Sequence, residues 1–404
     1  MKRIKTIIAT LLPLASLTCG AQGLKDAYRD YWRTCVSVNQ WEVAAEANPS
    51  NKHDVTGMVS GDQTANWKNV VEHFDWVVAE NCMKCEVIHP EEGIYDFTLA
   101  DEFVDKALAS GLKVHGHALI WHSQCAKWFH TDKEGKLVSP EVLKKRMRDH
   151  IITIVSHFKG RVSSWDVVNE AFEDDGTPRK SLFYQILGSD YIPLAFQYAH
   201  EADPNVELVY NDFSMNKATK IDGIARFFRT LVSAGMPIHA IGFQGHMILE
   251  DAKELLTQYD YSLSVVKSLG LKAQYSELDL SVLPNPYGFS GANISDRFTY
   301  TPEKDPYKNG LTPEKEAEIA DFWINFYKLM LKHKETVQRL GFWCTNDANS
   351  WRNDFPIKGR TDYATLFDRQ NKPKAFVKDI IDLVKPQCCK EDNSNKKSKK
   401  RKKK

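Results

Sequence analysis

Two kinds of hydrophobic pattern alternate along most of the chain. Short runs rich in β-branched and aromatic residues predict buried strands. A longer stretch usually follows, in which apolar residues recur every three or four positions, and this spacing predicts an amphipathic helix. Strands are expected at Thr34–Val38, Cys82–Ile88, Lys113–Leu119, Ser163–Val168, Val206–Asn211, Ala240–Gln244, Lys272–Ser276 and Leu340–Cys344. Helices are expected at Leu99–Ser110, Ser139–Phe158, Ile221–Ala234, Ala252–Leu269, Thr312–Gln338 and Lys374–Val384.

The alternation of strands and helices predicts the fold class. Ser139 and Thr312 each precede Pro-Glu, which is an N-cap followed by proline at the first helical position. Strands that alternate with helices form βαβ units and a parallel sheet that is buried on both faces. About eight such units between Leu24 and Lys385, with no linker-like composition, favour an α/β fold that is one closed (β/α)8 TIM barrel. We expect this single domain to cover residues 22–389.

In such a barrel, functional residues gather where the strands end. Acidic, amide and aromatic side chains follow these ends: Glu80, Asn81, Lys84, His117, Trp121, Asn169, Glu170, Asn211, Asp212, Gln244, His246, Glu277, Asp279, Trp343 and Trp351. This mixture suits a carbohydrate site better than a phosphate or metal site.

Glu170 and Glu277 each come directly after an apolar strand, on opposite sides of the predicted barrel. Cleavage of a glycosidic bond needs two carboxyl groups, one that protonates the leaving oxygen and one that acts at the anomeric carbon. A single glutamate at a strand end is more often solvated or ion-paired. The amides and His246 nearby favour the catalytic interpretation here.

Composition excludes other classes of protein. With 42% hydrophobic and 26% charged residues, the chain is neither collagen-like nor disordered throughout. The formal net charge of +1 results from cancellation, because basic ends offset a net charge of −9 in residues 22–389. An acidic body offers no basic face to nucleic acid, so we expect no nucleic-acid binding.

Both ends have distinctive sequences. Residues 1–21 combine Lys2, Arg3 and Lys5 with an apolar run too short to span a membrane, which predicts a cleaved signal peptide. We therefore expect export to the periplasm, the cell surface or the medium. Lipid attachment through Cys19 is a weaker alternative. Residues 390–404 are expected to form a basic, disordered tail, which either contacts an anionic surface or has no partner.

Eight cysteines leave seven after cleavage, and an odd number argues against a complete disulfide framework. Cys82 and Cys85 form one C-x-x-C without a second pair, which is weak support for a zinc site. We expect most of the thiols to be packing residues or local bridges, and we expect no metal or cofactor.

Several motifs together resemble the family 10 glycoside hydrolases, the endo-β-1,4-xylanases. They are residues 80–97, Gly116-His117-Ala118-Leu119-Ile120-Trp121-His122-Ser123-Gln124, Trp165-Asp166-Val167-Val168-Asn169-Glu170, Tyr210-Asn211-Asp212-Phe213, Gly242-Phe243-Gln244-Gly245-His246, Ser276-Glu277-Leu278-Asp279 and Trp343 with Asp347 and Ser350-Trp351. The resemblance spans residues 24–385, with the motifs in the family's order.

The resemblance implies hydrolysis of xylan and xylo-oligosaccharides by a retaining mechanism, with Glu170 as acid/base and Glu277 as nucleophile. It also implies a set of substrate-binding residues: Glu80, Asn81, Lys84, His117, Trp121, Gln124, Asn169, Tyr210, Gln244, His246, Trp343 and Trp351. We expect a monomer without a membrane span. Asp279 and Asp347 are expected to be structural.

The sequence departs from the family pattern at Cys85, where tryptophan is common, and at Cys125-Ala126, which replaces a hydrophobic-proline pair. Two other functions remain open. A metal-dependent hydrolase would use His115 and His117, which alternate onto one face of a strand. A non-catalytic glycan-binding barrel would keep the aromatic cleft, but the presence of both Glu170 and Glu277 argues against it.

Overall fold

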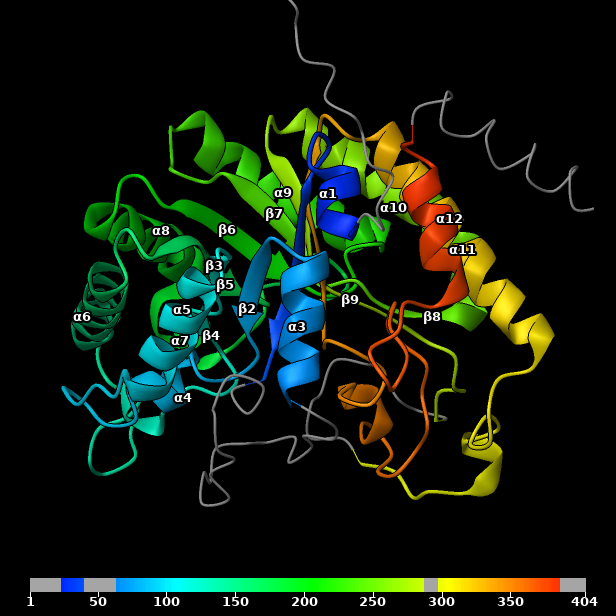
Figure 1. The fold of residues 1–404 in the computed structure, drawn as a ribbon. Helices are drawn as coiled ribbons and strands as arrows, with labels where there is room; N and C mark the ends of the chain where they lie inside the picture. The colour runs from blue at the N-terminus through cyan, green and yellow to red at the C-terminus, as the bar shows by residue number, and fades with distance from the viewer. Residues whose placement is uncertain (1–22, 40–62, 287–296, 386–404) are drawn as a thin grey trace, which may run out of the picture.

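The computed structural model describes residues 23–39, 63–286 and 297–385. Within them, parallel strands close a barrel with helices around it (Figure 1). The barrel strands are β1 (Arg33–Val38), β2 (Trp76–Ala79), β3 (Lys113–Gly116), β5 (Val162–Asn169), β6 (Glu207–Asp212), β7 (Ala240–Phe243), β9 (Lys272–Ser281) and β10 (Val337–Phe342). Pairing of β10 with both β1 and β9 closes the ring, which confirms the predicted (β/α)8 barrel.

Two short strands extend the barrel at its rim. β4 (Ile120–Trp121) pairs with the end of β5, so that Trp121 lies opposite Asn169. β8 (His246–Ile248) pairs with the end of β9, so that His246 lies opposite Asp279. These extensions hold aromatic and imidazole side chains beside the strand ends that carry the carboxylates.

Helices cover the outside of the barrel. They are α1 (Leu24–Tyr28), α3 (Gln63–His73), α4 (Cys85–Ile88), α5 (Thr98–Ala109), α6 (Pro140–His157), α7 (Leu182–Leu187), α8 (Tyr191–Ala202), α9 (Ala218–Ser233), α10 (Ala252–Ser268), α11 (Pro313–Lys332) and α12 (Ala375–Asp382). Ser139 and Thr312 cap α6 and α11 as predicted, each accepting a backbone N–H at its side-chain oxygen. The main hydrophobic core lies between helices and strands, with Trp165, Tyr275 and Trp323 among its largest buried side chains.

The structure corrects three predicted boundaries. The second strand is Trp76–Ala79, and the whole of the predicted strand Cys82–Ile88 is instead a rim loop and helix α4. The third strand ends at Gly116 rather than Leu119. The helix predicted at Thr312–Gln338 ends at Lys332, since Val337 already belongs to β10.

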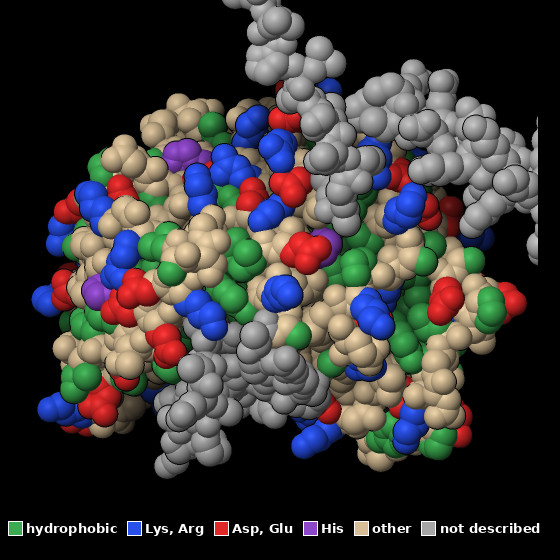
Figure 2. Space-filling model, in the orientation of Figure 1, with side chains coloured by type: hydrophobic (Ala, Val, Ile, Leu, Met, Phe, Trp, Pro, Cys, Tyr) green, Lys and Arg blue, Asp and Glu red, His purple; other side chains and the backbone are tan. Residues whose placement is uncertain are grey.

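The face of the molecule in Figure 2 carries Lys and Arg side chains intermixed with Asp and Glu. No helix among the described segments is long and apolar enough to cross a membrane. The predicted signal peptide and basic tail lie outside the described residues.

Candidate active site

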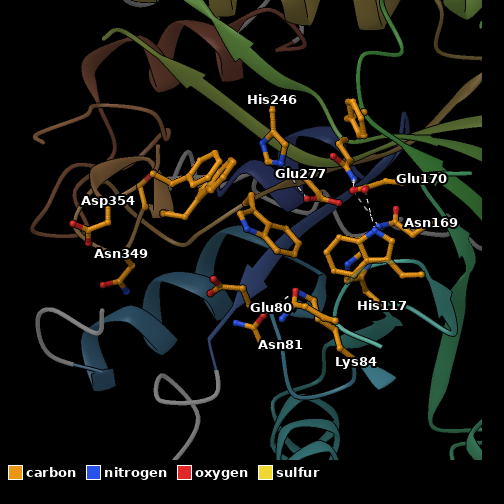
Figure 3. Close-up of a pocket in the computed structure, with 18 of the residues that line it drawn as sticks. Glu80, Asn81, Lys84, His117, Asn169, Glu170, His246, Glu277, Asn349 and Asp354 are labelled. Carbon is orange, nitrogen blue, oxygen red and sulfur yellow. Dashed lines mark hydrogen bonds and ion pairs between the residues drawn. The ribbon is translucent and has the colours of Figure 1, made fainter. Parts of the chain in front are cut away.

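A cavity opens at the carboxyl ends of the barrel strands. It is lined by Glu80, Asn81, Lys84, His117, Trp121, Gln124, Asn169, Glu170, Phe213, Gln244, His246, Glu277, Arg297, Trp343, Asn349, Ser350, Trp351, Asp354 and Phe355. Figure 3 shows Glu170 and Glu277 close together in this cavity, with Glu80, Asn81 and Lys84 along one wall. The sequence-predicted residues therefore converge, with Tyr210 as the exception.

Glu170 is held by donors on both carboxyl oxygens. Trp121 Nε1 donates to Oε2 at 2.9 Å, and Gln244 Nε2 donates to Oε1 at 2.8 Å. The backbone at Glu170 has a φ of 58°, a left-handed conformation that is uncommon for residues other than glycine. Its backbone N–H donates to the Asn211 carbonyl at 2.9 Å, which helps to hold this conformation. The side chain is 8% exposed, so the carboxyl group is shielded but reachable from the cavity.

Glu277 is also held at both carboxyl oxygens, and it lies within β9, which continues to Ser281 rather than ending at Ser276 as predicted. Asn211 Nδ2 donates to Oε1 and His246 Nε2 contacts Oε2, each at 3.1 Å. Asn211 Nδ2 also donates to Asn169 Oδ1 at 3.1 Å, and Ser276 Oγ donates to Asn211 Oδ1 at 2.8 Å. Asn211 is therefore the buried amide that joins the Glu277 side of the site to the Glu170 side. Its position at a strand end was visible in the sequence, but its role as a bridge was not.

His246 lies between two carboxylates. Its Nδ1 is 2.9 Å from Asp279 Oδ2, opposite the contact to Glu277. Although burial favours the neutral ring, Asp279 and Glu277 raise the pKa of His246 to about 9. Both ring nitrogens then carry protons at neutral pH, so His246 donates to both carboxylates.

Asp279 anchors this side of the site, as the sequence analysis expected. Burial opposes its ionisation, but Arg352 and His246 hold the pKa of Asp279 well below its usual range. Arg352 Nη2 lies 2.9 Å from Oδ1, and Trp351 Nε1 donates to Oδ2 at 2.7 Å. Arg352 was not predicted as a site residue, although its position next to Trp351 in the sequence could have indicated it.

The opposite wall carries Lys84. Its Nζ donates to Asn81 Oδ1 at 2.8 Å and to Gln124 Oε1 at 2.7 Å, and it lies 5.1 Å from the centre of the Trp121 ring. Burial lowers the pKa of Lys84, an effect that Glu80 and Glu277 oppose. Lys84 is therefore not the surface ion pair that is the usual fate of lysine.

The two histidines of the metal-hydrolase alternative share one carboxylate. His117 Nδ1 lies 2.9 Å and His115 Nε2 lies 3.0 Å from the same oxygen of Asp166. No group of three His, Cys, Asp or Glu side chains is arranged as metal ligands in the described part of the chain. His117 also faces the cavity and packs edge-on against Trp343, with ring centres 5.8 Å apart.

Tyr210 lies away from the cavity, contrary to the prediction that it binds substrate. It is fully buried, and its ring packs on Phe228 with centroids 4.8 Å apart. Its hydroxyl donates to Asp212 and accepts the Ala171 N–H at 3.0 Å. Through this bond to Ala171, Tyr210 supports the loop after Glu170 on the side that faces away from the cavity. Six lining residues were not predicted: Phe213, Arg297, Asn349, Ser350, Asp354 and Phe355.

Comparisons with known proteins agree on one family. The model of glycosyl hydrolase family 10 matches residues 42–383. Endo-1,4-beta-xylanase A of Xylanibacter ruminicola is 40% identical over 373 residues, which cover 92% of this chain and 96% of that protein. Beta-1,4-xylanase of Dictyoglomus thermophilum is 32% identical over 360 residues, covering 89% and 90%. The solved structure of a GH10 endoxylanase from a sugarcane soil metagenome superposes with a TM-score of 0.82 at 36% identity, covering 89% of this chain and all of that one.

Proposed function

The chain belongs to glycosyl hydrolase family 10, and from that premise we propose that Glu277 is the nucleophile and Glu170 the acid/base of a retaining endo-β-1,4-xylanase. The enzyme hydrolyses internal β-1,4 bonds of xylan and so acts in xylan degradation. The observation that carries the assignment of roles is the different environment of the two carboxyl groups. Glu277 accepts hydrogen bonds from Asn211 and the cationic His246, whereas Glu170 accepts them only from uncharged donors, Trp121, Gln244 and Asn169.

The first step follows from these environments. His246 contacts Oε2 of Glu277 at 3.1 Å and holds this carboxylate in place for attack on the anomeric carbon. Glu170 has only neutral donors in direct contact, and we assign it the protonation of the departing sugar oxygen. The products of this step are a glycosyl ester on Glu277 and an ionised Glu170.

In the second step, Glu170 accepts a proton from water as that water attacks the ester, which restores both carboxyl groups. Asn169 lies beside Glu170, with Nδ2 3.4 Å from Oε1, and faces the cavity where the sugar ring would sit. The indole rings of Trp121, Trp343 and Trp351 line the cavity and suit the C–H faces of sugars.

We assign sugar binding to the remaining predicted residues of the cavity wall, Glu80, Asn81, Lys84, Gln124 and His117, because their polar atoms face the same space. Discrimination between xylan and glucan rests on one hydroxymethyl group per sugar. A close pocket discriminates such a group by about 1–3 kcal/mol, so weak activity on glucans is expected.

Substitution of the two glutamates tests the assigned roles. Glu277→Ala should lower kcat on xylan by at least about 10³-fold, because no carboxylate remains to form the ester. Glu170→Ala should lose a similar factor on xylan but much less on an aryl xylobioside, whose leaving group needs little protonation. Glu314→Gln, at an exposed position in the first turn of α11, is the matched control and should keep full activity. Near-native hydrolysis of xylan by Glu277→Ala would refute the assignment.

We also propose that the enzyme is exported as a monomer after loss of residues 1–21, and that its basic tail contacts an anionic surface. The charge and apolar run of the first residues and the basic residues of 390–404 support this. Determination of the N-terminal residue of the mature protein should give Gln22. Retention of Met1 would contradict cleavage.

A further inference from the structure

Two thiols lie in contact at the edge of the sugar-binding wall. Cys85 Sγ and Cys125 Sγ are 3.5 Å apart, although 40 positions separate them in the sequence. Cys85 begins helix α4, and Cys125 follows β4. They are also the two cysteines that stand where the sequence departs from the family pattern. Among the cysteines that the structure describes, Cys85 and Cys125 form a sulfur–sulfur contact and are not yet bonded to each other.

The residues next to the two thiols are already joined by hydrogen bonds. The Glu86 N–H donates to the Gln124 carbonyl at 3.1 Å, and Gln124 Nε2 donates to Glu86 Oε1 at 3.1 Å. On the cavity side, Lys84 Nζ donates to Gln124 Oε1. The segments 84–86 and 124–125 thus form one unit, and Lys84 and Gln124 are its contribution to the cavity wall.

Gln124 needs this support because its backbone has a φ of 44°. A left-handed conformation at a residue other than glycine costs of the order of one kcal/mol and persists only where the surroundings hold it. A covalent link at the next residue would hold it more firmly than hydrogen bonds that water can replace.

We propose that Cys85 and Cys125 are a site of disulfide formation, and that the bond braces Lys84 and Gln124 in the sugar-binding wall. Both thiols lose their proton, one sulfur–sulfur bond forms, and the two electrons reduce an external disulfide to two thiols by thiol–disulfide exchange. Export, as proposed above, would place the enzyme where such disulfides persist. The inference concerns the thiols alone, and its chemical test does not depend on the substrate.

The chemistry of the pair sets the conditions of the test. The hydrogen bond to Cys85 and burial raise the pKa of the Cys125 thiol. Because the thiolate is the attacking species, exchange is expected to be slow at neutral pH and faster at about pH 8.5.

The full chain is incubated at that pH with oxidised glutathione or with a thiol reductant, alkylated, and digested without reduction. Mass spectrometry of the oxidised sample should find one peptide pair linked through Cys85 and Cys125. Closure of a loop of this length should raise the Tm by roughly 5 °C, and reductant should reverse the increase. At a temperature between the two Tm values, the oxidised enzyme should keep activity that the reduced enzyme loses.

Two variants distinguish the effect of the Cys85–Cys125 disulfide from general effects of oxidation. Cys85→Ser/Cys125→Ser should show no linked peptide and no oxidant-dependent change in Tm. Cys82→Ala, which removes the other cysteine of the C-x-x-C, should still give the linked peptide and the oxidant-dependent increase in Tm. Reduced thiols, a stable glutathione adduct on Cys125 or an unchanged Tm after oxidation of the wild-type chain would overturn the proposal.

Discussion

His246 is the residue whose charge depends most on its neighbours. Asp279 holds one nitrogen, Glu277 the other, and together they keep the ring protonated at neutral pH. Arg352 balances the charge of Asp279 from the far side, so that cations and carboxylates alternate from Arg352 to Glu277. This order places a positive charge next to the proposed nucleophile.

The raised pKa predicts how stability depends on pH. Because the folded-state pKa of His246 is about 9 and its ordinary value is 6.5, its stabilising effect is complete below pH 6.5 and disappears as the pH rises through 9. The full effect is about 3 kcal/mol. His246→Gln should therefore remove part of the decrease in the free energy of unfolding between these pH values, as measured by urea titrations at each pH. An identical decrease in wild type and variant would show that His246 is not charged in the folded protein.

Tyr210 and Asn211 show that the direction of a single side chain could not be predicted from the sequence. Both belong to one motif, yet successive residues of a strand point to opposite faces. Asn211 points into the barrel toward Glu277, and Tyr210 points out toward Phe228 of helix α9. The motif identified the right strand end, but the choice of face depends on the register of β6, which the tertiary structure sets.

At the scale of elements, the second strand shows why local hydrophobicity misleads. Trp76–Ala79 is only four residues long, and all four are buried. The next residues, Glu80 to Cys85, are buried as well, because they line the cavity or pack under it. Cys82, Met83, Cys85 and Ile88 are the buried apolar residues of this rim segment, and they make the sequence Cys82–Ile88 resemble a strand. Helix α8 was not predicted, although its Pro193 lies in the first turn, where proline costs no intrahelical hydrogen bond.

The close packing of β7 against β6 holds Asn211 in place, and this can be tested by substitution. Gly242 of β7 leaves space for Asn211 of β6, since a Cβ at this position would lie 2.4 Å from Asn211 Oδ1. Gly242→Ala should displace Asn211 from Glu277, lowering kcat about tenfold and the stability by about 1–3 kcal/mol.

Gly223→Ala is the matched control. Its Cβ would lie 2.2 Å from the Gly176 carbonyl oxygen, a backbone atom, so this variant should cost at least as much stability without touching Asn211. Both variants are assayed below their Tm values. Equal kcat values for the two would contradict the role assigned to Asn211.

At the scale of the whole molecule, the alternation of strands and helices was sufficient to predict a closed barrel. Parallel strands buried on both faces have few other arrangements in a chain of this length. Convergence of the strand-end residues into one cavity then followed from the geometry of the barrel. The contacts within the cavity did not follow, because they depend on side-chain conformations that no sequence pattern encodes.

Hydrolysis of xylan by this enzyme should be independent of metal ions. The proposed steps use only Glu170, Glu277 and the donors around them. Extensive treatment with EDTA followed by gel filtration should leave the rate of xylan hydrolysis unchanged. A loss of activity that zinc or another divalent cation restores would favour the metal-dependent alternative.

The stereochemistry of the product distinguishes a retaining mechanism from a single displacement by water. If Glu277 forms a glycosyl ester and water then displaces it, two inversions restore the original configuration. Proton NMR during the first minutes of xylo-oligosaccharide hydrolysis should show the β-anomer at the new reducing end, followed by slow conversion to the equilibrium mixture. Initial appearance of the α-anomer would mean a single displacement by water and would contradict the proposed roles of Glu170 and Glu277.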